Sequence, residues 1–158
     1  SLLTVILVHG LFDTQFFKND LALIFWLIIG LAIFPQRKIL EGIVIEGQKL
    51  GRQIGFPTAN IYSKQTLPHG IYASKVEIPA KSGKWYVGAM HYGARPAINN
   101  SALSFEVHIL DFKGDIYGQK IRVEVYDYLR GVEKFDSLEA LTKQIDLDVK
   151  NVRNIIVN

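Results

Sequence analysis

The pattern of hydrophobic and polar positions changes character near residues 35–40. Before this point the chain contains an unbroken apolar run of 14 residues, Leu21 to Phe34. A membrane span usually needs about 20 apolar residues, and a surface helix shows a polar face. The run therefore predicts an apolar helix that is shorter than a typical membrane span and lacks the polar face of a surface helix. We favour a packed helix, or sequence that is not native to the domain and is fused upstream of it, over membrane insertion. We therefore divide the chain into residues 1–40, a segment of unknown role, and residues 41–158, one domain.

Residues 41–128 show the period-2 alternation of β-strands, with many Val, Ile and Tyr residues between turn signals. The expected strands are Gly42–Glu46, Gly70–Ile78, Lys84–Tyr92, Ser104–Asp111 and Lys120–Tyr128. Two short polar segments, 81–83 and 113–115, separate alternating runs as hairpin connections do. Such short links join antiparallel strands. The pattern therefore predicts a mainly β domain, either a sandwich or a barrel.

The C-terminal part changes to helical spacing. Asp136 is placed to cap a helix, and Glu139 three residues later would complete a capping box. The apolar residues Leu138, Leu141 and Ile145 share one helical face. We expect a helix over about 137–145, with a further helical turn or two after Asp148.

Composition narrows the possible partners. The formal net charge is only +3 at pH 7, and the chain has no Lys/Arg-rich run of the kind that follows a phosphate backbone, so a nucleic-acid partner is not expected. The absence of cysteine excludes disulfides and thiolate metal sites, so any metal must be bound by oxygen or imidazole. We expect a cytoplasmic monomer, with membrane association through residues 21–34 as the less favoured alternative.

A glycine-rich segment holds the first candidate site. Residues 46–60 contain three glycines and end in Pro-Thr-Ala-Asn. Glycines let the backbone approach phosphates closely, although no Walker motif is present and an ordinary β connection would also account for the spacing. Thr58 and Asn60 lie two residues apart and share a face if the chain is extended. Their oxygens are suitable ligands for Mg²⁺ carrying nucleotide phosphates.

Glu106 is a second candidate because it is a carboxylate in the middle of an expected strand. Alternation puts it on one face with His108, while Phe105 and Val107 lie on the other. A positioned carboxylate can accept a proton from an alcohol that attacks a phosphoryl group. The alternative is an exposed residue on a solvent face. His108 is expected to be a packing or surface residue, since no second imidazole lies at ligand spacing.

Two arginines and several aromatic residues are weaker candidates. Arg95 lies on a turn, where it either contacts phosphate or is solvated. Arg130 follows the last expected strand, where it either borders a ligand pocket or pairs with a carboxylate. The aromatic residues Tyr72, Tyr117, Tyr126, Tyr128 and Phe135 are expected mostly in a barrel core, with one or two lining a flat heterocycle.

Five blocks in order resemble the riboflavin kinase family, including the C-terminal domain of bacterial bifunctional FAD synthases. They are GRQIGFPTAN (51–60), LPHGIYA (67–73), YGARP (92–96), FEVHILDFKGDIYG (105–118) and LRGVEKFDSLEALTKQI (129–145). The resemblance implies a six-stranded antiparallel Greek-key barrel with a C-terminal helix. It also implies transfer of the γ-phosphate of ATP, with Mg²⁺ or another divalent metal, to the 5′-hydroxyl of riboflavin, giving FMN and ADP.

The resemblance also implies roles for single residues. The ATP- and phosphate-binding residues would be Gly51, Gly55, Pro57, Thr58 and Asn60. Of these, Thr58 and Asn60 would hold the metal. Glu106 would be the catalytic base, and Arg130 and Phe135 would bind riboflavin.

The chain departs from the family pattern at two places. Ala97 stands where bacterial members usually have Thr, and residues 1–40 lack the His-x-Gly-His motif of the adenylyltransferase half of FAD synthases. We therefore do not expect this chain to make FAD. A non-catalytic barrel that binds flavin or nucleotide, positioned by the apolar segment, is the alternative function. The joint presence of Thr58, Asn60 and Glu106 favours the kinase.

Overall fold

The computed structural model describes residues 21–33, 37–47, 49–81, 83–94 and 103–157. The chain forms two compact units, Ser1–Gln36 and Arg37–Asn158. The described part of the first unit is an apolar helix, α2 (Leu21–Ile33), which occupies the run where the sequence predicted one. Among the helices that the model describes, none is both long enough and apolar enough to cross a membrane.

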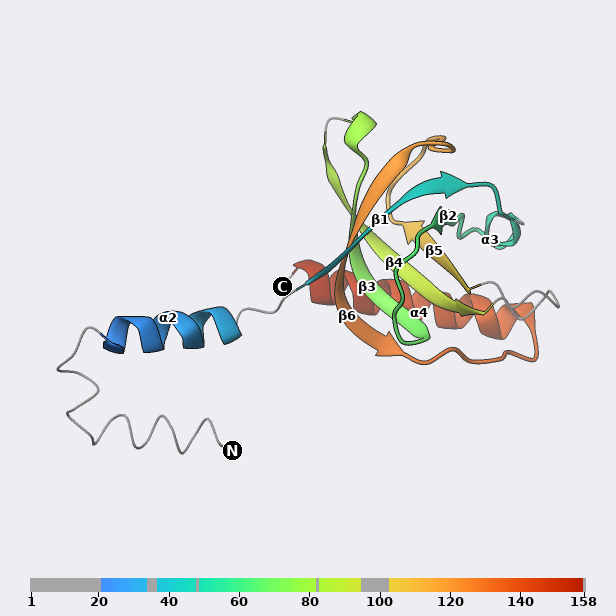
Figure 1. The fold of residues 1–158 in the computed structure, drawn as a ribbon. Coiled ribbons are helices and arrows are strands. Elements are labelled where there is room, and N and C mark those ends of the chain that lie inside the picture. The colour runs from blue at the N-terminus through green and yellow to red at the C-terminus, as the bar shows by residue number, and fades with distance from the viewer. Residues whose placement is uncertain (1–20, 34–36, 48, 82, 95–102, 158) are drawn as a thin grey trace. The chain divides into compact units, whose positions relative to one another are not determined.

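The second unit is a closed barrel of six antiparallel strands (Figure 1). The strands are β1 (Lys38–Ile45), β2 (Ala59–Tyr62), β3 (Gly70–Glu77), β4 (Trp85–Ala94), β5 (Leu103–Ile109) and β6 (Lys120–Arg130). They close in the order β1-β2-β5-β4-β3-β6. In this order β3, β4 and β5 are consecutive neighbours and β6 returns beside β3, which is a Greek key. The six-stranded barrel that the resemblance implied is thus confirmed.

Hydrophobic periodicity located five of these strands and missed β2. The burial pattern of β2 has three buried residues followed by one exposed residue, so the segment shows no alternation to detect. β1 also begins earlier than predicted, at Lys38, because residues 38–43 pair continuously with β6. Residues 38–40 therefore lie within the barrel.

The segment 113–115 is not a hairpin turn, which corrects the sequence prediction. It connects β5 to β6, but β5 pairs with β2 and β4, whereas β6 pairs with β1 and β3. A short turn signal between two alternating runs does not specify which strands pair, because the barrel brings nonconsecutive strands together. The segment 81–83, in contrast, does join two paired strands, β3 and β4.

The barrel interior forms the hydrophobic core. Buried side chains from all six strands fill it, and the Tyr92 and Phe105 rings stack with centroids 4.2 Å apart. Val107 and Ile109 are also buried, as the alternation of this strand predicted. Tyr128 departs from the prediction of a core aromatic residue, because half of its surface is exposed near the end of β6.

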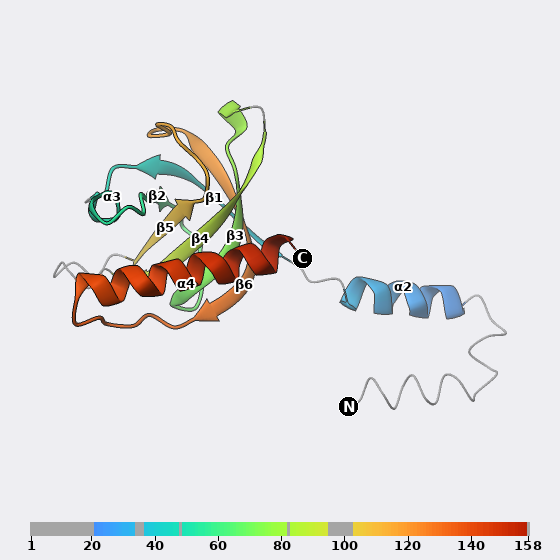
Figure 2. The same ribbon diagram turned by 180° about the vertical axis from the view of Figure 1, so that it is seen from behind.

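One helix, α4 (Leu138–Val157), lies across the outer face of the barrel and contacts β3, β4 and β6 (Figure 2). Two predictions about it were wrong. The helix continues through 145–149 without a break, since no Gly or Pro interrupts it. Its N-cap is Ser137 instead of Asp136, because the Ser137 hydroxyl accepts a hydrogen bond from the Ala140 amide at 3.1 Å.

Candidate functional site

A cavity of about 830 Å³ lies on the outer face of the barrel, where α4 and the segment that leads into it face the strands. One part of its lining is polar and comes from the glycine-rich segment, β2 and β5. The other part comes from β3, residues 132–138 and α4, and mixes apolar side chains such as Ile71 and Phe135 with charged ones such as Glu133 and Lys134. The cavity therefore offers charged groups together with an apolar surface, which suits a ligand with a charged end and a flat hydrophobic body.

Strand pairing places five cavity residues in one row around the barrel wall. Asn60 on β2 pairs with Glu106 on β5, and Glu106 pairs with His91 on β4. The row continues to Ile71 on β3 and ends at Arg130 on β6. Directly paired residues of antiparallel strands project to the same side, and all five line the cavity. The row joins three residues that were singled out from the sequence with two that were not.

The glycine-rich segment forms a tight loop around a single helical turn, α3 (Leu50–Gln53). The Phe56 amide donates a hydrogen bond to the Gly51 carbonyl at 2.7 Å. A Cβ on Gly51 would overlap the Phe56 carbonyl, so only glycine fits there. Gly55 has φ +87°, which also favours glycine. Gly51 lines the cavity, whereas Gly55 and Pro57 are not among the lining residues.

His108 holds this loop against the barrel. Its Nδ1 atom lies 2.8 Å from the Pro57 carbonyl, which can only accept, so Nδ1 is the donor. The Phe56 ring meets the His108 ring edge-on, with centroids 5.4 Å apart. These contacts are those of a packing residue. Within the described ranges no group of three His, Asp or Glu side chains could hold a metal ion.

Thr58, Asn60 and Glu106 line the same polar region of the cavity. Asn60 is almost fully buried, and Gly47 leaves the space that its carboxamide occupies, since a Cβ at Gly47 would overlap it. Glu106 is half-buried. The Thr58 hydroxyl and the Asn60 carboxamide supply oxygen atoms, and Mg²⁺ is a hard cation that binds oxygen ligands together with substrate phosphates. The donor set therefore fits a magnesium ion that carries nucleotide phosphates.

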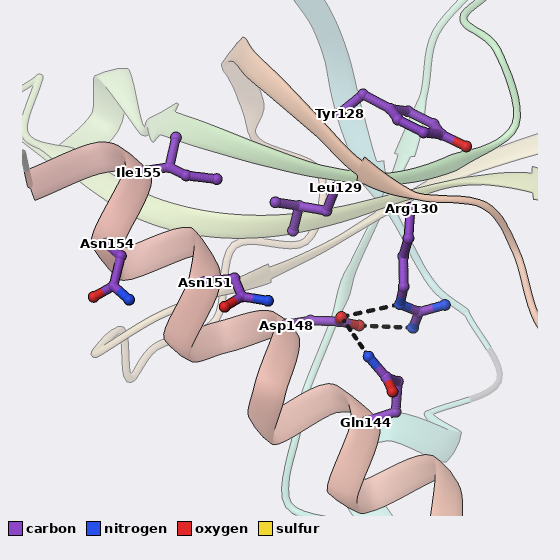
Figure 3. Close-up of a pocket in the computed structure, with 8 residues that line it drawn as sticks. All are labelled: Tyr128, Leu129, Arg130, Gln144, Asp148, Asn151, Asn154 and Ile155. Atoms are coloured by element: carbon purple, nitrogen blue, oxygen red, sulfur yellow. Dashed lines mark hydrogen bonds and ion pairs between the residues drawn. The ribbon is translucent and has the colours of Figure 1, made fainter.

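Arg130 borders the cavity and also pairs with a carboxylate, so both alternatives from the sequence hold. Its Nε and Nη2 atoms donate to Asp148 of α4 at 3.0 and 2.7 Å (Figure 3). The hydrogen bonds to Asp148 raise the pKa of Arg130 above its ordinary value, so the guanidinium stays charged throughout the range in which enzymes work. The Phe135 ring, which also lines the cavity, lies 5.8 Å from the guanidinium carbon.

Several cavity residues were not singled out from the sequence, among them His91, Asp148 and Lys49. His91 lies between the core residues Met90 and Tyr92, just as Glu106 lies between Phe105 and Val107. The same pattern, a polar side chain between two apolar ones in mid-strand, could therefore have identified it. Asp148 interrupts an apolar helical stripe, and a carboxylate at such a position indicates a buried group that needs a partner. Lys49 lies at the entrance to α3 and had no distinguishing pattern. Arg95 and Ala97, which the sequence did single out, lie outside the described residues.

Comparison with known proteins identifies relatives of the barrel. A family model for flavokinase, that is riboflavin kinase, matches residues 35–156. The bifunctional riboflavin kinase/FMN adenylyltransferase of Haemophilus influenzae is 46% identical over 114 residues, which are 71% of this chain and 36% of the relative. An RNA-binding riboflavin kinase of Bacillus subtilis is 38% identical over 116 residues, which are 72% of this chain and 49% of the relative. This chain thus spans less than half the length of either curated relative.

A solved structure supports the same relationship at the level of the fold. The riboflavin kinase from Trypanosoma brucei is 26% identical to this chain and superposes with a TM-score of 0.54. The alignment covers 76% of this chain and 80% of that chain. The barrel and its C-terminal helix are thus shared with a protein of this name.

Proposed function

This chain belongs to the riboflavin kinase family, and from this premise we propose that it transfers the γ-phosphate of ATP to the 5′-hydroxyl of riboflavin, giving FMN and ADP. The observation that carries the proposal is the row of cavity residues from Asn60 to Arg130. It joins a polar end, where phosphates would lie, to an end flanked by apolar side chains, where a flavin ring would lie. Glu106 follows Asn60 in this row, at the polar end.

Glu106 would act as the general base. The 5′-oxygen of riboflavin attacks the γ-phosphorus, the hydroxyl proton passes to the Glu106 carboxylate, and the bond to the ADP oxygen breaks. Glu106 suits this role because it projects into the cavity beside Asn60, at the polar end. Positioning of this kind, together with charge stabilisation, is most of what phosphoryl transfer requires from a protein.

Thr58 and Asn60 would hold a divalent metal, and Gly51 with the loop around α3 would cover the nucleotide phosphates. When bound, Mg²⁺ neutralises charge that builds up on the phosphate oxygens. The side chain of Lys49 also lines this end of the cavity and adds a positive charge. Gly55 and Pro57 would contribute through the shape of the loop, since they do not line the cavity themselves.

At the other end of the row, Phe135 and the apolar side chains of residues 132–145 would pack against the flavin ring. Arg130 would contribute mainly by holding this wall in place, because each of its three nitrogen atoms already donates to Asp148 or to the Gly131 carbonyl. Aromatic and aliphatic side chains around a few polar groups are what a heterocycle site needs.

The remaining expectations stay predictions. These are a cytoplasmic monomer, no formation of FAD by this chain, and no nucleic-acid partner. The expectation that no nucleic acid binds needs a direct test, because one relative is named as an RNA-binding riboflavin kinase. A gel-shift titration with single-stranded and hairpin RNA should show no complex at physiological salt.

The proposal is tested by incubating the purified protein with riboflavin and MgATP and measuring FMN by chromatography. We expect FMN to form, and Glu106→Gln to lower kcat by about a hundredfold or more while riboflavin and ADP still bind. Glu124→Gln is the matched control, because Glu124 also lies in mid-strand but pairs with Arg37 outside the cavity. Flavin binding without FMN formation would instead support the non-catalytic alternative.

A further inference from the structure

A buried carboxylate on α4 has no part in the reaction proposed above. Asp148 is only 4% exposed, although it lies in a helical stripe whose other members are apolar: Leu141, Ile145 and Val152. Burial of an ionised carboxylate is costly unless the group is paired and hydrogen-bonded. Its presence in this stripe therefore depends on the partners that it meets.

Those partners form a closed network (Figure 3). The Arg130 guanidinium approaches from β6 and donates to both oxygens of Asp148, at 3.0 and 2.7 Å. Gln144, one helical turn before Asp148, donates to Oδ1 at 3.0 Å. Such two-pronged pairing fixes the planes of both groups. The Tyr128 ring points away from the network.

The same guanidinium also holds the chain that leaves the barrel. The Arg130 Nη1 atom donates to the Gly131 carbonyl at 3.0 Å, and the Glu133 carboxylate lies 3.8 Å from Nη1. Gly131 begins the segment 131–137, from which Val132 and Phe135 line the cavity. Asp148 thus acts through Arg130 on the segment that forms one wall of the cavity.

The network also borders a second, smaller hollow. This hollow of about 340 Å³ is lined by Arg130 and Asp148 together with Asn151 and Ile155 (Figure 3). Arg130 and Asp148 line the large cavity as well. The pair therefore forms a boundary that the large cavity and the smaller hollow share.

We propose that Asp148, supported by Gln144, is a positioning residue that fixes Arg130 and the segment 131–137, so that the wall facing the flavin ring is formed before the ligand binds. This inference rests on the proposed function. Arg130 and Asn60 are separated by four strand spacings, about 19 Å along the wall at about 4.8 Å per spacing. The effect of Asp148 should therefore reach the flavin and leave the nucleotide phosphates unchanged.

The test is Asp148→Asn in the full chain, with steady-state kinetics for both substrates. An asparagine keeps the size of the side chain but loses the charge and one of the two acceptors. We expect the riboflavin KM and Kd to rise about tenfold, while the ATP KM stays the same and kcat changes less than about threefold. An equal loss in kcat and in both KM values would overturn the proposal.

A second ion pair on the same helix supplies the matched control. Arg153 pairs with Asp111 on the loop after β5 at 2.9 Å, so it also ties α4 to the barrel, but neither residue lines the cavity. Asp111→Asn should leave the riboflavin KM unchanged. If it raised this KM as much as Asp148→Asn does, Asp148 would only be docking the helix, and the proposal would be wrong.

Two further measurements keep the proposal separate from the proposed function and from folding. The riboflavin Kd, measured from quenching of flavin fluorescence, reports on the wall of the cavity even if the parent protein forms no FMN. A parent protein that binds riboflavin but forms no FMN would overturn the proposed kinase activity and leave the role of Asp148 open to this measurement. A parent that binds no riboflavin overturns both. If Asp148→Asn does not fold, Gln144→Leu decides: we expect a Kd about threefold higher, and an unchanged Kd overturns the proposal.

Discussion

The position of Asn60 depends on a residue without a side chain. Its carboxamide fills the space beside Gly47, where even a methyl group would overlap it. The φ angle of Gly47 is not positive, so a side chain at this position would be excluded by space and not by backbone conformation. A glycine that sequence reading would assign to backbone flexibility is thus part of the packing of a proposed metal ligand.

Gly47→Ala should therefore displace the Asn60 carboxamide and weaken binding of MgADP about tenfold, with riboflavin binding unchanged. Isothermal titration measures both affinities. The control is the same substitution in an Asn60→Ala background. There the added methyl group has no carboxamide to displace, so it should lower the MgADP affinity only slightly further. A loss of equal size in that background would show that Gly47 acts through the loop and not through Asn60.

At the scale of elements, exposed ion pairs tie the outer edges of the barrel together. Asp111 on the loop after β5 accepts hydrogen bonds from Arg153 of α4, and Glu41 on β1 is paired with Lys120 on β6. These hydrogen bonds lower the pKa of both carboxyl groups below their ordinary values. The two pairs thus link stability to pH.

A carboxyl group with a lowered pKa stabilises the folded state above its unfolded pKa and loses that contribution as pH falls through the folded pKa. We therefore expect the melting temperature to be steady from pH 7 to about pH 5 and to fall below about pH 4. The double variant Glu41→Gln/Asp111→Asn should melt earlier than the parent at pH 7, and this difference should shrink as pH falls through the lowered pKa values of the two carboxyl groups. Parallel curves at all pH values would contradict this linkage.

The elements that periodicity predicted are those in which one face is buried and the other is not. β6 alternates between core and outer face over most of its length and was placed to within a few residues. β2 and the pairing of β5 could not be predicted in this way, because a run of consecutive buried residues has no period and pairing is set by closure of the barrel. The site shows the same limit: Thr58, Asn60 and Glu106 were recognised from sequence, but the row that joins them exists only through strand pairing.

At the scale of the whole molecule, the family match begins at residue 35, and the barrel unit begins at Arg37. All described residues of the cavity belong to this second unit. The barrel therefore holds its own core and its own candidate site, and neither requires the apolar helix α2.

A shortened protein that begins at Arg37 should accordingly fold, bind riboflavin and form FMN with kinetic constants close to those of the full chain. Circular dichroism and the FMN assay check these points, and Glu106→Gln in the shortened protein is the control for residual activity. A shortened protein that folds but no longer binds flavin would instead favour a role for residues 1–36 in the site.

Site and core residues alternate along the same strands: Glu106 lies between Phe105 and Val107, and His91 between Met90 and Tyr92. A one-residue insertion in β4 or β5 would turn every later side chain to the opposite face, placing a charged group in the core and an apolar one in the cavity. Divergence in this lineage can therefore exchange side chains at the site but cannot change the spacing between them. Differences in length among relatives should be confined to the connections, such as the one between β5 and β6.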